Sequence, residues 1–145
     1  YVAKMLDMPA IRAHEVASFY TMYNLAPVGR YHVHCCTTTP CWLRGSDEVV
    51  KACKDALGIG FGETTADGQF TLTEVECLGA CVTAPMVQVD DAKDGSEIFY
   101  EALNYATTRE LLLTLKRHGK PKAGSQSGRH TSEPAGGRTT LKENV

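Results

Sequence analysis

Four of the six cysteines in this 145-residue chain fall into two closely spaced pairs. Four residues separate Cys36 from Cys41, three separate Cys77 from Cys81, and 35 residues lie between the two pairs. Each pair follows a segment with the pattern of a β-strand. Because loops that follow neighbouring strands can meet at one edge of a sheet, the sequence predicts four thiolates that converge on one site.

Three kinds of site are compatible with such cysteines. A framework of structural disulfides suits small secreted chains, but this chain is long enough for a sizeable core, and residues 1–8 lack a signal-peptide pattern. A tetrahedral zinc site usually has two to four residues between paired cysteines. A two-iron cluster is wider than one ion, so longer gaps allow each pair to bind its own iron. The spacing favours the cluster and leaves the other two open.

Composition and charge restrict the partners. The net charge of −2 gives no argument for nucleic acid or an anionic membrane surface as a partner. No apolar run approaches the ~18 residues of a membrane-spanning helix. Residues 119–145 contain five basic and two acidic residues, five glycines and few large apolar side chains, so we expect an extended or disordered tail there.

The remaining pattern predicts an α/β fold, a small mixed sheet flanked by helices. We expect an N-terminal helical segment (1–28) with a helix from Pro9 to about residue 24, then a single domain (29–118). Within the domain, strands are predicted at 30–35, 69–75, 85–89 and 97–103, with a hairpin turn at Asp94 and Gly95. Helices are predicted at about 42–57 and after Thr107 or Thr108 as the N-cap.

Strand alternation distinguishes Cys35 from Cys36. Tyr31, Val33 and Cys35 share one face of the first strand, which predicts that Cys35 points into the core. Cys36 then begins the loop, where its thiolate can turn toward Cys41.

Other cysteine and histidine residues have simpler interpretations. Cys53 lies on the apolar stripe of a predicted helix and is expected in the core. His32 and His34 share a strand face, as ligands of a Rieske-type cluster can, but the Cys–His pairing of that motif is missing. We therefore expect solvent or interface histidines.

Two segments of the chain carry a resemblance to a known family. EVASFYTMYNLAPVGRYHVHCCTTTPCWLRG and VECLGACVTAPMVQV closely resemble the thioredoxin-like 2Fe–2S ferredoxin subunit of respiratory complex I, which is called the 24 kDa subunit in mitochondria and is part of NADH-quinone oxidoreductase in bacteria. The similarity spans about residues 1–118. It implies a thioredoxin-like fold, one 2Fe–2S cluster and the iron ligands Cys36, Cys41, Cys77 and Cys81. It also implies a longer helical bundle, of which this chain carries the last helices.

The resemblance implies an electron-transfer role in NADH:quinone oxidoreductase. The cluster would accept an electron from FMN on the flavin- and NADH-binding subunit, in the peripheral arm of complex I. This chain itself shows no Gly-rich phosphate loop, since GIGFG ends a predicted helix and begins none.

The resemblance also implies a location. The chain would be attached through its partners to the matrix side of the mitochondrial inner membrane or to the cytoplasmic side of a bacterial inner membrane. The alternatives are the equivalent diaphorase subunit of an NAD-linked hydrogenase or formate dehydrogenase, and a zinc-stabilised interaction module.

Residues around the cysteines have predicted supporting roles. The hydroxyl groups of Thr37, Thr38 and Thr39, with backbone N–H groups, are candidate hydrogen-bond donors to cluster sulfur. Gly79 permits close approach of the backbone. Trp42 is a candidate shield for the cluster or an interface residue, and Pro85 a candidate for a cis bond.

The N-terminal helix and the tail are predicted contact surfaces for a partner. The helix carries aromatic residues beyond what a small sheet needs to cover it, namely Phe19, Tyr20 and Tyr23. The tail is positively charged and suits an acidic groove.

Overall fold

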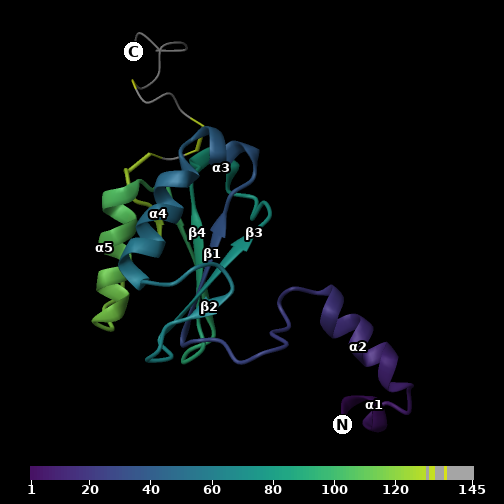
Figure 1. Ribbon diagram of the computed structural model, residues 1–145. Helices are drawn as coiled ribbons and strands as arrows, with labels where there is room; N and C mark the ends of the chain where they lie inside the picture. Colours follow the sequence, from purple (N-terminus) through teal and green to yellow (C-terminus); the bar gives the residue numbers. More distant parts are fainter. Residues whose placement is uncertain (130, 133–135, 137–145) are drawn as a thin grey trace.

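The computed structural model of the protein describes residues 1–129, 131–132 and 136, and Figure 1 shows its arrangement. The helices are α1 (Val2–Met5), α2 (Ala10–Phe19), α3 (Thr39–Leu43), α4 (Ser46–Leu57) and α5 (Tyr105–Lys116), with a 3₁₀ turn η1 at Cys81–Thr83. The strands are β1 (Tyr31–Cys36), β2 (Glu63–Thr64), β3 (Phe70–Val75), β4 (Val87–Asp91), β5 (Ser96–Glu101) and β6 (Gly124–Ser125).

The strands form one mixed sheet in the order β2-β3-β1-β4-β5-β6. The central strand β1 pairs in parallel with β3 and antiparallel with β4. A parallel pair needs a crossover, and α3 and α4 provide it. The carboxyl ends of β1 and β3 therefore meet at one edge, where Cys36 is in register with Val75. This edge carries the cysteine loops.

The core lies between one face of the sheet and the helices α4 and α5 (Figure 1). Tyr31, Val33 and Cys35 are buried on that face, as the alternation in β1 predicts. Cys53 of α4 is buried in the same cluster, which confirms its predicted core position. The mixed sheet with flanking helices confirms the predicted α/β architecture.

The helix predicted at 42–57 is two helices. Gly45 adopts a left-handed conformation, with φ of +95°, and separates α3 from α4. The first of them begins at Thr39, so Cys41 lies in a helix and not in the loop that we expected. Pro40 occupies the first turn of α3, where the missing N–H costs no helical hydrogen bond.

Several predicted boundaries also shift. The N-terminal helix ends at Phe19, before residue 24. The first strand begins at Tyr31 and includes Cys36. The last helix is capped by Asn104, whose side chain accepts a hydrogen bond from the Thr107 N–H, so the predicted caps at Thr107 and Thr108 were wrong. The hairpin turn at Asp94 and Gly95 is confirmed, with Gly95 in the left-handed region.

Both ends of the chain extend from the domain. The helices α1 and α2 bury no residue and stand apart from the sheet in Figure 1. Within the predicted tail 119–145, Gly124–Ser125 forms β6 and pairs in parallel with β5. The rest of that prediction, at 130, 133–135 and 137–145, lies outside the described residues. None of the helices in the described part of the chain has the length and apolarity to cross a membrane.

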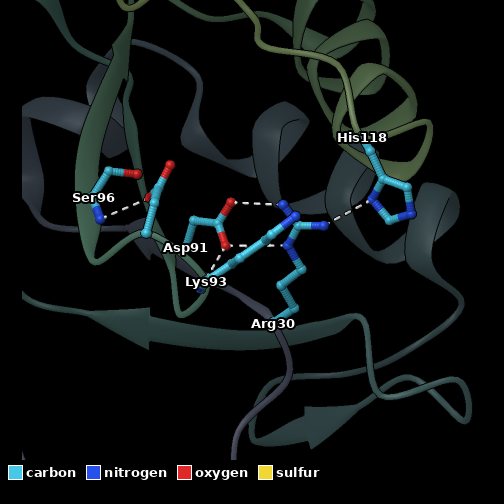
Figure 2. A network of polar contacts seen from close by, with 6 residues as sticks. Arg30, Asp91, Lys93, Ser96 and His118 are labelled. Carbon is cyan, nitrogen blue, oxygen red and sulfur yellow. Dashed lines mark hydrogen bonds and ion pairs between the residues drawn. The ribbon is translucent and has the colours of Figure 1, made fainter.

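An ion pair closes the end of the sheet opposite the cysteines. The Arg30 guanidinium, just before β1, donates two hydrogen bonds to the Asp91 carboxylate at the end of β4, at 3.1 and 3.0 Å (Figure 2). Arg30 also donates to His118 Nδ1 at 3.0 Å, after the end of α5. The hydrogen bond from Arg30 lowers the pKa of Asp91. This contact joins two strands and a helix.

Candidate metal centre

The first cysteine pair lies at the carboxyl end of β1. Cys36 is the last residue of the strand and Cys41 lies in α3, and both side chains are buried. Ala84 and Met86 pack with them and form an apolar floor. The Thr38 hydroxyl lies 3.3 Å from Cys36 Sγ. The short helix α3 thus turns the second thiol of the pair back toward the strand.

The second pair lies in the loop after β3. The sulfur atoms of Cys77 and Cys81 are 3.2 Å apart, and the two side chains are exposed and partly exposed. Gly79 is left-handed, with φ of +86°, and its N–H donates to Cys77 Sγ at 3.4 Å. Gly79 therefore allows a tight turn that directs its own backbone N–H at a cysteine sulfur atom.

The structure brings the four cysteines together at one edge of the sheet. Within each pair the two thiols shift each other's pKa, and Thr38 influences the pKa of Cys77 as well as that of Cys36. The charge of Cys36 influences the pKa values of both Cys77 and Cys81. All four predicted ligands thus share one electrostatic environment.

Within each pair, the pKa of one thiol is lowered and the pKa of the other is raised. Burial opposes ionisation of Cys36, but hydrogen bonds, the strongest from Thr38 and Cys41, outweigh it and lower the pKa. Burial and the contact with Cys36 raise the pKa of Cys41 to about 12. The Gly79 N–H lowers the pKa of Cys77, while Cys77 raises that of Cys81. Each pair therefore combines a thiol whose pKa is lowered with one whose pKa is raised, and binding of a metal ion would displace the thiol protons.

The donor set consists of four thiols, which suit a zinc ion or an iron–sulfur cluster. Tetrahedral zinc with Zn–S bonds of ≈ 2.3 Å needs sulfur atoms about 3.8 Å apart throughout. Among the described residues, the set of three ligand atoms within 4.8 Å of one another consists of His32, His34 and Asp90, with no cysteine. The sulfur atoms of Cys77 and Cys81 are 3.2 Å apart, and a two-iron cluster would take one pair of cysteines on each iron. All six cysteines belong to the described part of the chain, and all are free there.

The predicted supporting residues have different outcomes. Of the three threonines, Thr38 lies beside a cysteine sulfur, whereas the Thr37 hydroxyl donates to Glu74 and Thr39 begins α3. The peptide bond between Ala84 and Pro85 is cis, as suggested for that proline. Trp42 is 58% exposed, and Leu43 and Val82 beside the cysteines are exposed too. These three exposed side chains lie within two residues of Cys41 or Cys81 in the sequence, and we refer to them as the apolar rim.

The histidines of β1 differ from the expectation. His32 is buried, and its Nε2 lies 2.6 Å from the Thr73 hydroxyl. His34 contacts Asp90, with 3.0 Å between Nε2 and Oδ2. The prediction of solvent or interface histidines was therefore wrong for His32, which is 8% exposed. Sequence reasoning also missed Asp90, because its contact with His34 depends on the antiparallel register of β4 against β1.

Comparisons with known proteins identify relatives of this chain. Residues 1–116 match the family model described as thioredoxin-like [2Fe-2S] ferredoxin. The chain is 57% identical over 112 residues to a protein of Rickettsia typhi named as a subunit of NADH-quinone oxidoreductase, a match that covers 77% of this chain and 62% of that protein. It is 50% identical over 142 residues to the mitochondrial NADH dehydrogenase [ubiquinone] flavoprotein 2 of Dictyostelium discoideum, a match that covers 98% of this chain and 55% of that protein.

A solved structure shares the fold. A crystal structure of an NAD+-reducing [NiFe]-hydrogenase in the H2-reduced state superposes with a TM-score of 0.68 at 20% identity, over 82% of this chain and 19% of that chain. The chain spans about 60% of the length of the curated relatives above. With the family model matching most of its length, the chain belongs to the thioredoxin-like [2Fe-2S] ferredoxins.

Proposed function

We propose that this chain holds one 2Fe–2S cluster on Cys36, Cys41, Cys77 and Cys81 and is the electron-transfer subunit of an NADH:quinone oxidoreductase. The observation that carries the proposal is the meeting of two thiol pairs at the carboxyl edge of β1 and β3. The names of the relatives from Rickettsia typhi and Dictyostelium discoideum support the assembly. When bound, such a cluster supplies one-electron transfer.

The residues of the chain tune that chemistry. Cys36 and Cys41 hold one iron over the apolar floor of Ala84 and Met86, which restricts water on that side. Cys77 and Cys81 hold the other iron on the exposed side. Hydrogen bonds to cluster or cysteine sulfur stabilise the reduced form, and the Gly79 N–H is already directed at Cys77.

The proposed electron partner is FMN on a flavin- and NADH-binding subunit of the peripheral arm. The exposed side of the site carries the apolar rim of Trp42, Leu43 and Val82. Apolar side chains around a redox centre are suited to pack against another subunit and to exclude water from the path. The NADH and FMN sites belong to that partner in this proposal, and the chain attaches to a mitochondrial or bacterial inner membrane only through the assembly.

The N-terminal helices offer a second contact surface. Ile11, Val16 and Phe19 of α2 are exposed, and the helix buries none of its residues. An amphipathic helix in water gains most of its stability from packing of its apolar side. We propose that other subunits, or further helices of a longer chain, cover this side.

The test is reduction by NADH in the assembled state. The chain is purified with its flavin-bearing partner, mixed with NADH and frozen for EPR. We expect an NADH-dependent cluster signal with the partner and none with the chain alone, because this chain is proposed to have no NADH site. A cluster that stays oxidised in the flavin-containing complex contradicts the proposal. Copurification with nickel or molybdenum identifies a hydrogenase or formate dehydrogenase assembly instead.

A further inference from the structure

Two histidines and an aspartate meet on the face of the sheet opposite α4 and α5. His32 and His34 alternate with the core residues of β1, and β4 places Asp90 in register with His32. One ligand atom of each residue lies within 4.8 Å of the other two. This grouping arises from the antiparallel register of β1 and β4.

We propose that His32, His34 and Asp90 form a binding site for a divalent first-row transition metal ion. Imidazole nitrogen and carboxylate oxygen are borderline ligands that suit Zn²⁺, Ni²⁺ and Cu²⁺. Metal bonds of ≈ 2.0–2.1 Å place tetrahedral ligand atoms about 3.3 Å apart. His34 Nε2 and Asp90 Oδ2, which are 3.0 Å apart, nearly have this spacing already. His32 completes the three ligands, and a water molecule takes the fourth position.

Neighbouring polar groups hold the ligands in place. The Gln88 Nε2 amide donates to Asp90 Oδ1 at 2.7 Å and leaves Oδ2 directed at His34. The Thr73 hydroxyl lies 2.6 Å from His32 Nε2 and orients that ring. The two imidazole rings lie side by side, with centroids 3.9 Å apart. Supporting hydrogen bonds of this kind orient ligands in known metal sites.

Burial and charge favour a cation here. Burial, together with the neighbouring His34, lowers the pKa of His32 to about 4, so its ring is neutral at physiological pH. Neutral imidazole is the form that binds metals. The site is reachable from solvent, since the side chains of Asp90 and His34 are 33% and 15% exposed. The carboxylate supplies negative charge for the incoming ion.

The ligand chemistry separates this site from the cysteines. The four thiols bind metal through sulfur, at a Zn–S distance of ≈ 2.3 Å, whereas the proposed site offers nitrogen and oxygen only. X-ray absorption at the zinc edge distinguishes the two coordination types without interference from iron. It therefore reports on this site in the cluster-containing protein.

The experiment adds Zn²⁺ to the protein as purified with its cluster, and measures bound zinc by equilibrium dialysis and coordination by zinc-edge absorption. We expect one zinc ion with nitrogen and oxygen ligands and an unchanged visible spectrum of the cluster. Asp90→Asn retains the shape of the side chain and removes its charge, and we expect it to weaken binding at least tenfold. His34→Gln should have a similar effect.

His14→Gln is the matched control, because His14 is exposed on α2, away from the sheet, and we expect it to bind zinc like the wild type. Unchanged zinc affinity in Asp90→Asn overturns the proposal, as does zinc bound through sulfur or no bound zinc at 0.1 mM free ion. If either variant loses the cluster spectrum, Gln88→Leu is tested in its place, because it removes the hydrogen bond from Gln88 to the Asp90 carboxylate. We expect that variant also to weaken zinc binding, and unchanged affinity counts against the site.

Discussion

The thiol of Cys35 donates a hydrogen bond to Cys53 across the core, with 3.7 Å between the sulfur atoms. This contact joins β1 to α4 and directs Cys35 away from the proposed metal ligands. The hydrogen bond to Cys53 and burial together raise the pKa of Cys35. Adjacent cysteines in the sequence therefore have opposite environments, because Cys36 faces Thr38 and Cys41.

Replacement of these two neighbours should have opposite effects. We expect Cys35→Ala to retain the full cluster and to lower the free energy of unfolding by about 1–2 kcal/mol, because it removes one buried sulfur atom. Cys36→Ala should lose or strongly perturb the cluster. Iron content and the reduced-state EPR signal distinguish the variants, with Cys53→Ala as a core control. A cluster lost in Cys35→Ala but kept in Cys36→Ala contradicts the assignment.

Local pattern was sufficient to predict much of this site. The alternation of apolar and polar residues in β1 correctly separated Cys35 from Cys36, because a strand buried on one face has a strict period of two. The helix over Cys41 was missed although its signal was present, since Pro40 is typical of a first helical turn. The Asn104 cap was also available as an N-cap residue type.

Features that depend on distant pairing could not be predicted from pattern alone. The contact between His34 and Asp90 requires the register of β1 against β4, and many registers are compatible with the sequence. The strand β6 lies in a Gly-rich segment with few apolar residues, whose composition predicts no strand. It forms because the edge of β5 offers hydrogen-bonding groups.

The Arg30–Asp91 contact predicts a stability difference. Arg30→Lys retains the charge but loses the two-pronged hydrogen bonding, so we expect the unfolding midpoint to fall by about 2–5 °C. Arg12→Lys provides the comparison, because Arg12 pairs with Glu15 on the exposed surface of α2. Its midpoint should stay within about 1 °C of the wild type. If differential scanning calorimetry gives Arg30→Lys and Arg12→Lys the same unfolding midpoint, the contact between Arg30 and Asp91 stabilises the fold no more than an exposed ion pair does.

The apolar side of α2 predicts an assembly defect. The side chain of Phe19 is 77% exposed. Its ring packs edge-to-face against the ring of Tyr20, with 5.1 Å between the two ring centroids. We expect Phe19→Ser to weaken association with the flavin-bearing partner about tenfold, since aromatic anchors dominate interfaces. The cluster spectrum should not change, because no residue of α2 is buried and the helix stands apart from the sheet (Figure 1). Arg12→Ser, on the same helix, is the control, and an equal loss in both variants argues against an apolar contact.

Removal of the tail tests its predicted role as a further contact surface. The strand β6 pairs with β5, and the Gln126 N–H donates to the Glu101 carbonyl at 2.8 Å. Deletion of 119–145 should weaken assembly and leave the visible spectrum of the cluster intact, because the cysteines lie on other elements. Binding is measured by surface plasmon resonance against the immobilised partner. Loss of the cluster on deletion contradicts a role limited to contact.

The central claim is that two thiol pairs hold two irons, and metal and sulfide analysis with EPR of the dithionite-reduced protein tests it most directly. The account predicts about two irons and two acid-labile sulfides per chain. It also predicts an EPR signal from one unpaired electron in the reduced protein, which disappears on reoxidation. One zinc ion on the cysteines, with neither sulfide nor EPR signal, would contradict it.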